Sequence, residues 1–136
     1  MKLGFSGSRN GMNKFQHHWF ERLVKRFEPE WLLHGACQGA DETAVVIMRD
    51  LWPKQYVKAF PPVVKTYLSK YSLDLSHVIE PPKDYLVRND LIVAACDFLI
   101  ATPSPESKGT RYTISRARTA RKPVIVIEID SLRAWS

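Results

Sequence analysis

The sequence contains few cysteines. Cys37 and Cys96 are the only two among 136 residues, they lie far apart, and neither belongs to a CxxC pair. This excludes a disulfide framework and a cysteine-rich zinc site, so we expect two buried or half-buried thiols. His17 and His18 also have no partner at the spacing of metal ligands. We therefore expect no metal site and no resident cofactor.

Long apolar runs are missing as well. Runs such as residues 91–95 and 98–101 fall far short of the roughly 20 residues that a membrane-spanning helix needs. The first ten residues, MKLGFSGSRN, lack the apolar core of a signal peptide. We therefore expect a cytoplasmic protein that does not contact a membrane.

Acidic residues are outnumbered by basic ones, 14 to 20, which gives a formal charge of +6. Such a balance favours anionic partners, including nucleic acid, although it also suits any small soluble domain. With 45% hydrophobic and 25% charged residues the composition is that of a globular protein. The length suits a single domain over residues 1–136.

Strand and helix patterns alternate along the chain. Expected strands are residues 2–6, 31–34, 56–60, 98–101 and 124–129, and expected helices are residues 14–27, one starting within 35–41, about 84–95 and 110–122. The segment 61–83 is less regular. We interpret residues 63–71 as a short helix and residues 76–80 as a short strand. Alternation predicts an α/β, Rossmann-like three-layer fold with a parallel sheet of about five strands, order 3-2-1-4-5, and helices on both faces.

The first helix has the clearest local signals. Phe15, Trp19 and Phe27 fall on a four-residue repeat that predicts one buried face. Asn13 followed by Gln16 three residues later is the pattern of a capping box. We therefore expect this helix to begin just after Asn13.

Loops after several strands should meet at one edge of the sheet. Ligands of such sheets bind at the carboxyl ends of the strands where the strand order reverses, here between strands 2–6 and 98–101. The turn Lys108-Gly109-Thr110 opens a helix at this edge. Free N–H groups and the helix dipole at such a turn favour a phosphate or carboxylate.

Several side chains suit a phosphorylated ligand. Arg9 and Arg88 suit bidentate contact with phosphate, and structural ion pairs are the alternative for both. Asn89 suits hydrogen bonds to a ribose or base. Lys108 and Thr110 suit phosphate contact, with helix capping as the alternative for both.

Four short motifs occur in order between positions 7 and 110: Gly7-Ser8-Arg9, Gly35-Ala36-x-x-Gly39-Ala40-Asp41, Arg88-Asn89 and Gly109-Thr110. Together they resemble the SLOG superfamily, named for the Smf/DprA and LOG proteins, and most closely its compact YpsA-like members. The resemblance implies a site for a nucleotide or nucleotide-derived ligand. The residues it assigns to ligand or phosphate binding are Gly7, Ser8, Arg9, Gly35, Ala36, Gly39, Asp41, Arg88, Asn89, Lys108, Gly109 and Thr110.

The resemblance does not fix a reaction. LOG enzymes hydrolyse the N-glycosidic bond of nucleoside 5′-monophosphates, with an Arg that Arg88 matches and a Glu where this chain has Thr113. A threonine cannot stabilise an oxocarbenium-like sugar as a carboxylate does. The candidate catalytic residues are Asp41, Arg88 and Glu106. For Asp41 the alternative is compensation of a helix dipole, and for Glu106 a solvated loop charge.

Three functions follow from these patterns. The first is binding of a nucleotide or nucleotide-derived ligand, with or without processing it. The second is a phosphoribohydrolase acting on nucleoside monophosphates. The third is single-stranded nucleic-acid binding, suggested by the net charge and by Arg111, Arg118 and Lys122 along the last helix, for which a solvated face is the alternative.

Two further expectations concern single features. SLOG-like proteins often form dimers, and Phe15, Trp19 and Phe20 form a large apolar surface for one helix, so a homodimer is possible. His34, at the end of the second strand, is expected to be a hydrogen-bonded core histidine rather than a functional one.

Overall fold

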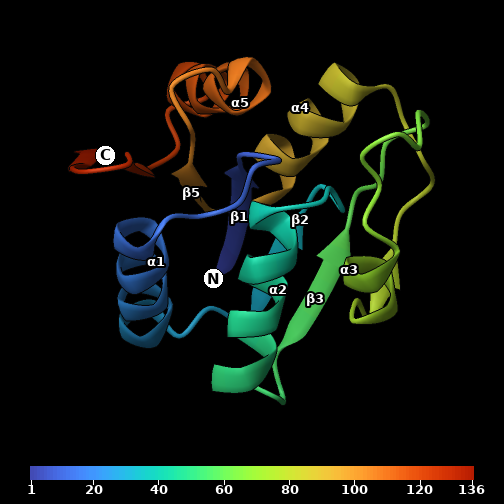
Figure 1. The fold of residues 1–136 in the computed structure, drawn as a ribbon, viewed down its shortest axis with the longest axis horizontal. Coiled ribbons are helices and arrows are strands. Elements are labelled where there is room, and N and C mark those ends of the chain that lie inside the picture. Colours follow the sequence, from blue (N-terminus) through green and yellow to red (C-terminus); the bar gives the residue numbers. More distant parts are fainter.

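The computed structural model describes the whole chain from Met1 to Ser136. Its sheet has seven strands in the order β4-β3-β2-β1-β5-β6-β7, and all neighbours are parallel except the antiparallel pair β6 and β7. Figure 1 shows most of these strands, with β1 in the middle. The strands are β1 (Lys2–Gly7), β2 (Trp31–His34), β3 (Tyr56–Ala59), β4 (Val78–Ile79), β5 (Phe98–Thr102), β6 (Val124–Ile127) and β7 (Leu132–Trp135).

The predicted α/β class and mostly parallel sheet are confirmed, but the strand count of about five is wrong. The five expected strands are present and keep their expected neighbours, and one more strand extends each edge. β4 falls within the short strand interpreted at 76–80. β7 was not expected. It forms because the chain turns back after β6, where the Glu128 N–H donates to the Ser131 carbonyl at 2.8 Å, and this turn ends β6 at Ile127 rather than at 129.

Helices cover both faces of the sheet (Figure 1). They are α1 (Lys14–Phe27), α2 (Ala40–Leu51), α3 (Lys70–Asp74), α4 (Tyr85–Ala95) and α5 (Lys108–Thr119). Alternate residues of β5 point to opposite faces. Phe98 and Ile100 join the core formed with α1 and α2, whereas Leu99 and Ala101 join the core formed with α4 and α5. None of the helices is long and apolar enough to cross a membrane.

The capping box of α1 is present as predicted. Asn13 accepts from the Gln16 N–H at 2.8 Å, and the Gln16 side chain accepts from the Asn13 N–H at 3.0 Å. Phe20 is fully buried in the core, and Phe15 and Trp19 pack partly against it. Much of the apolar surface that suggested a homodimer therefore lies inside the monomer.

The helix interpreted in 63–71 is wrong. Residues 61–69 form bends and turns, and α3 begins only at Lys70, after Ser69, whose side chain accepts from the Ser72 N–H. The backbone of this segment bonds instead to the loop after β2, with Gln38 N–H donating to Tyr67 and Ser69 N–H donating to Ala36, both at 2.8 Å. These bonds hold the segment beside the sheet edge where the candidate site lies.

Candidate functional site

The strand order reverses between β1 and β5, as the topology predicted. β1 pairs with β2 on one side and with β5 on the other. The Ser8 N–H continues the β1–β5 ladder by donating to the Thr102 carbonyl at 3.1 Å. Ligands of such sheets bind at this position, and we call the sheet edge at the carboxyl ends of β1 and β5 the crevice.

A small pocket lies in this crevice, with a volume of about 20 Å³. That volume holds roughly one water molecule. A larger ligand would therefore have to lie over the pocket or displace side chains at its rim. The residues that line it come from β1 and the loop after it, the β2–α2 loop and helix start, and α4: Phe5, Ser6, Gly7, Arg9, Gly35, Cys37, Asp41, Tyr85, Arg88, Asn89 and Ile92.

Arg88 lies on the inner side of the first turns of α4 and is only 2% exposed. Its guanidinium donates to the carbonyls of Gly35 and Phe60 and to Cys37 Sγ, and it stacks on the ring of Tyr85 with 4.8 Å to the centroid. The alternative of a structural salt bridge does not apply, because no carboxylate lies within ion-pair distance of this guanidinium. Its Nε is buried and has no partner.

Asp41 lies in the first turn of α2, as the sequence suggested, and is buried. Its carboxylate accepts from the N–H groups of Gly35 at 3.2 Å and Cys37 at 3.0 Å. Burial raises the pKa of Asp41 to about 6, although the charge of Arg88 and the two N–H donors oppose that rise. A carboxyl group with this pKa exchanges protons near neutral pH.

The β1 and β2 loops pack closely against each other. Gly39 precedes α2 with a φ of 86°, and a Cβ there would overlap the carbonyl of Arg9. Only glycine suits both the conformation and the space. Ala36 is in a left-handed conformation too, with a φ of 54°. The spacing of Gly39 in the motif therefore reflects a close backbone contact between two loops of the crevice.

The β1 loop presents one buried hydroxyl and one exposed cation. Ser8 is buried, accepts from the Asn10 N–H at 3.0 Å and donates to Ser104 Oγ. Arg9 is exposed, and its guanidinium lies 3.8 Å from the centroid of the Tyr67 ring. No carboxylate lies within ion-pair distance of Arg9, so the ion pair considered as its alternative does not form here.

The start of α5 has two free N–H groups. Lys108 is its first residue and is exposed, whereas Thr110 is buried. The N–H groups of Gly109 and Thr110 donate to no other group of the chain, and the preceding Ser107 forms no side-chain cap. The side chain of Tyr85 lies directly against Gly109. The helix terminus thus faces the crevice rim with donors available.

Thr113 lies one turn further into α5 and is fully buried. Its hydroxyl donates to the Gly109 carbonyl at 3.0 Å, within the same helix. Glu106 is exposed on the loop before α5 and does not line the pocket. Of the carboxylates considered for catalysis, the pocket therefore contains Asp41 and not Glu106.

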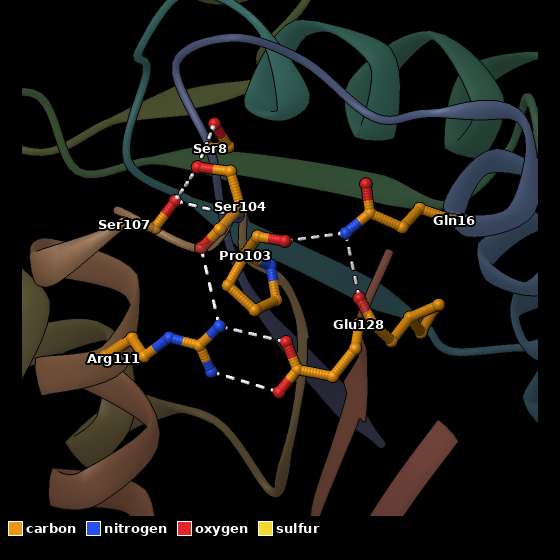
Figure 2. A network of polar contacts seen from close by, with 8 residues as sticks. Ser8, Gln16, Pro103, Ser104, Ser107, Arg111 and Glu128 are labelled. Carbon is orange, nitrogen blue, oxygen red and sulfur yellow. Dashed lines mark hydrogen bonds and ion pairs between the residues drawn. The ribbon is translucent and has the colours of Figure 1, made fainter. Parts of the chain in front are cut away.

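A polar network fixes the loop after β5 (Figure 2). Ser104 bonds to both Ser8 and Ser107, and its carbonyl accepts from Arg111 at 3.4 Å. Arg111 also forms a bidentate pair with Glu128, with distances of 3.0 and 2.9 Å. The pair holds the pKa of Glu128 below its usual range. Loops after β1, β5 and β6 are thereby tied together behind the crevice.

Gln16 supports the same loop from α1. Besides closing its capping box, it donates to the carbonyl of Pro103 at 2.7 Å (Figure 2). It also donates to the carbonyl of Ile127 at 2.9 Å. The sequence predicted the cap but not these two contacts. Ser104 and Tyr85 were also missed, since only the packed structure brings them to the crevice.

His34 is a hydrogen-bonded core histidine, as expected. Its Nδ1 accepts from the Ala36 N–H at 3.1 Å, so the proton lies on Nε2, which donates to Ser76 Oγ at 2.9 Å. Burial, together with the nearby charge of Arg88, lowers the pKa of His34 to about 3. The ring is therefore neutral at physiological pH and acts as a structural link.

The sequence matches no known protein-family profile and no curated protein. Its fold is similar to several solved structures, including the following three. The molybdenum cofactor binding protein from Rippkaea orientalis has a TM-score of 0.73 and 19% identity, with 95% of this chain and 77% of that one covered. TM1055, a structural-genomics target, has a TM-score of 0.65 and 16% identity, with 90% of this chain and 71% of that one covered.

The third structure is DNA processing protein A from Helicobacter pylori, described for its single-stranded DNA binding mode. It has a TM-score of 0.64 and 18% identity over 93% of this chain, which spans 64% of that protein. These folds match the fold that the four sequence motifs imply, and identities this low concern the fold alone.

Proposed function

We propose that this chain, which has the SLOG type of fold, binds a nucleotide or nucleotide-derived ligand in the crevice between β1 and β5. One observation carries the proposal. Two buried side-chain atoms of residues that line the pocket, Arg88 Nε and Asn89 Nδ2, have no hydrogen-bond partner. An unpaired buried polar group costs about 1 to 3 kcal/mol, so these two atoms favour a polar ligand or water that satisfies them.

The rim of the crevice suits a phosphate group. Arg9 and Lys108 are exposed cations on the loop after β1 and at the start of α5. The free N–H groups of Gly109 and Thr110 lie at the positive end of the α5 dipole. Charge and donor geometry both favour an anion, and a phosphate offers enough acceptor oxygens to use several of these donors at once.

The surface over the pocket suits the neutral part of such a ligand. Asn89 is 4% exposed and its amide can both donate and accept. Tyr67 and Tyr85 stand beside the two arginines with 46% and 44% of their surface exposed. Exposed aromatic rings next to a polar pocket suit contact with a base or a comparable ring. The similar folds of a cofactor-binding and a DNA-binding protein support ligand binding in this broad sense.

Hydrolysis of the N-glycosidic bond is a second candidate, and one observation favours it. Asp41 is a buried carboxyl group in the pocket with its pKa raised to about 6. A group of this kind suits proton transfer near neutral pH. Release of free base from nucleoside monophosphates, abolished by Asp41→Asn, would support this candidate. Absence of turnover at high protein concentration would exclude it and leave binding as the function.

Calorimetry tests the binding proposal. Nucleoside monophosphates, diphosphates and cyclic nucleotides are titrated into the protein, into Arg9→Ala and into Arg26→Ala, which removes an exposed arginine of α1. We expect at least one nucleotide to bind, and Arg9→Ala to weaken it about tenfold while Arg26→Ala changes nothing. Binding that is absent throughout, or equal in all three proteins, would refute the proposal.

A further inference from the structure

A second polar depression lies between α5 and β7 and shares no lining residue with the crevice pocket. Its volume is about 510 Å³, within the range of small-molecule sites. Three arginines, two hydroxyls and one indole dominate its walls: Arg111, Arg118, Arg133, Ser115, Thr119 and Trp135. Arg111 and Arg118 belong to the arginine row that the sequence singled out and that the crevice does not explain.

Trp135 organises two of these arginines. The guanidinium of Arg118 lies 4.3 Å from the centroid of its ring and that of Arg133 lies 4.8 Å away. Trp135 itself packs against the core formed by α4, α5 and the strands beneath them. Stacking on a fixed ring restrains each guanidinium while its N–H groups remain free to bind a ligand.

Both stacked arginines lack a charged partner. Neither the Arg118 nor the Arg133 side chain forms an ion pair or a hydrogen bond with another group of the chain. The one carboxylate in the wall, Glu128, is paired bidentately with Arg111, and the charge of Arg133 also helps to lower its pKa. With three arginines and one carboxylate, the lining of the depression carries a net charge of +2.

We propose that this depression is a second anion site, which binds a phosphate group of a free phosphorylated metabolite or of a single-stranded nucleic acid. Two restrained guanidinium groups match the several oxygens of a phosphate better than the single charge of a lysine would. The hydroxyls of Ser115 and Thr119, both exposed, add donors to the same wall. This inference does not depend on ligand binding in the crevice.

The test compares two charge-matched double variants. Arg118→Ala/Arg133→Ala removes the stacked pair, whereas Arg22→Ala/Arg26→Ala removes two exposed arginines from α1. Inorganic pyrophosphate, ATP and a 12-mer of thymidine are each titrated, and the indole N–H signal of Trp135 is followed by NMR. Circular dichroism checks that each variant remains folded. Arg9→Ala serves as the control for the crevice.

We expect at least one probe to shift the Trp135 signal, and its dissociation constant to rise tenfold or more in Arg118→Ala/Arg133→Ala only. Binding of the oligonucleotide alone would identify nucleic acid as the source of the phosphate. The slope of log K against log salt concentration should then fall by about 1.4 in that variant. Binding of pyrophosphate or ATP would identify a metabolite. Equal binding by both double variants, or no shift of the Trp135 signal with any probe, would overturn the proposal. A loss caused equally by Arg9→Ala would assign the binding to the crevice instead and overturn it as well.

Discussion

The side chain of Tyr85 occupies the space that a Cβ at Gly109 would need. This contact joins the start of α4 to the start of α5 across the mouth of the crevice. Tyr85 also stacks on Arg88, so one side chain positions the buried cation and restricts access to the pocket above it.

Replacement of Gly109 should therefore depend on the residue at position 85. In the parent chain Gly109→Ala should force Tyr85 away from Arg88 and destabilise the protein. In a Tyr85→Ala background the same change should stabilise it by about 0.5 to 1 kcal/mol, because alanine is the better helix former. Urea denaturation of the four proteins measures this coupling. An identical effect of Gly109→Ala in both backgrounds would contradict the observed contact.

Arg88 should matter for stability as well as for binding. Arg88→Ala leaves the buried carbonyls of Gly35 and Phe60 without this donor, which should cost about 2 to 4 kcal/mol. Arg9→Ala removes only an exposed, stacked cation and should change the free energy of unfolding by less than about 1 kcal/mol. Denaturation curves of the two variants measure the difference. Equal losses would mean that Arg88 is not held as the structure describes.

Asp41 should make stability fall as pH rises. Its folded-state pKa of about 6 lies above the ordinary value of 3.8, so the folded state binds a proton on this carboxylate more tightly than the unfolded state does. The stability gained from that proton is present at low pH and is lost as pH rises from about 4 to 6. Relative to Asp41→Asn, the parent should lose up to about 3 kcal/mol across this window. Denaturation of both proteins at pH 4 and pH 7 tests it. A difference that stays constant with pH would contradict the raised pKa.

His34 acts in the opposite direction. The folded-state pKa of His34, about 3, lies below the ordinary 6.5, so folding favours the neutral ring. The stability that depends on the neutral ring is therefore complete above pH 6.5 and is lost as pH falls toward 3. The two effects oppose each other in the parent protein. Comparison with Asp41→Asn is therefore more informative than the pH profile of the parent alone.

Gln16 should be among the more costly polar residues to replace. Its side chain serves the Asn13 N–H and the carbonyls of Pro103 and Ile127 from a buried position. Gln16→Leu should cost about 2 to 4 kcal/mol, because three backbone groups lose their partner. His17→Leu changes the exposed neighbouring residue and is the matched control. A loss below about 1 kcal/mol for Gln16→Leu would show that water replaces these contacts without penalty.

Local patterns predicted most of the fold. The apolar runs of β2, β5 and β6, the repeat of Phe15, Trp19 and Phe27, and the Asn13 cap depend on neighbouring residues, and the structure contains each of them. Residues 63–69 were misread as part of a helix because their conformation depends on backbone bonds to the β2–α2 loop, which no local pattern records. β7 was missed for the same reason, since its pairing with β6 follows from a turn rather than from a long apolar run.

The sequence likewise predicted some features of the candidate site and missed others. Topology and the glycine motifs predicted which loops meet at the crevice, and the pocket contains Gly7, Arg9, Gly35, Asp41, Arg88 and Asn89 from the expected set. Tyr85, Cys37 and the Ser104 network were not predicted, because their contacts join residues that are distant in sequence. Glu106 was a candidate only because of its place before α5, and its side chain remains in solvent.

The most direct test of the proposed function is an NMR titration of ¹⁵N-labelled protein with the tightest-binding nucleotide. We expect the largest amide shifts at residues 7–10, at 35–41 and at Gly109 and Thr110, whose N–H groups are free at the start of α5. Shifts at these three segments, reduced in Arg9→Ala, would agree with a ligand in the crevice. Shifts confined to residues 111–119 of α5 and to β7, or none at saturating nucleotide, would contradict it.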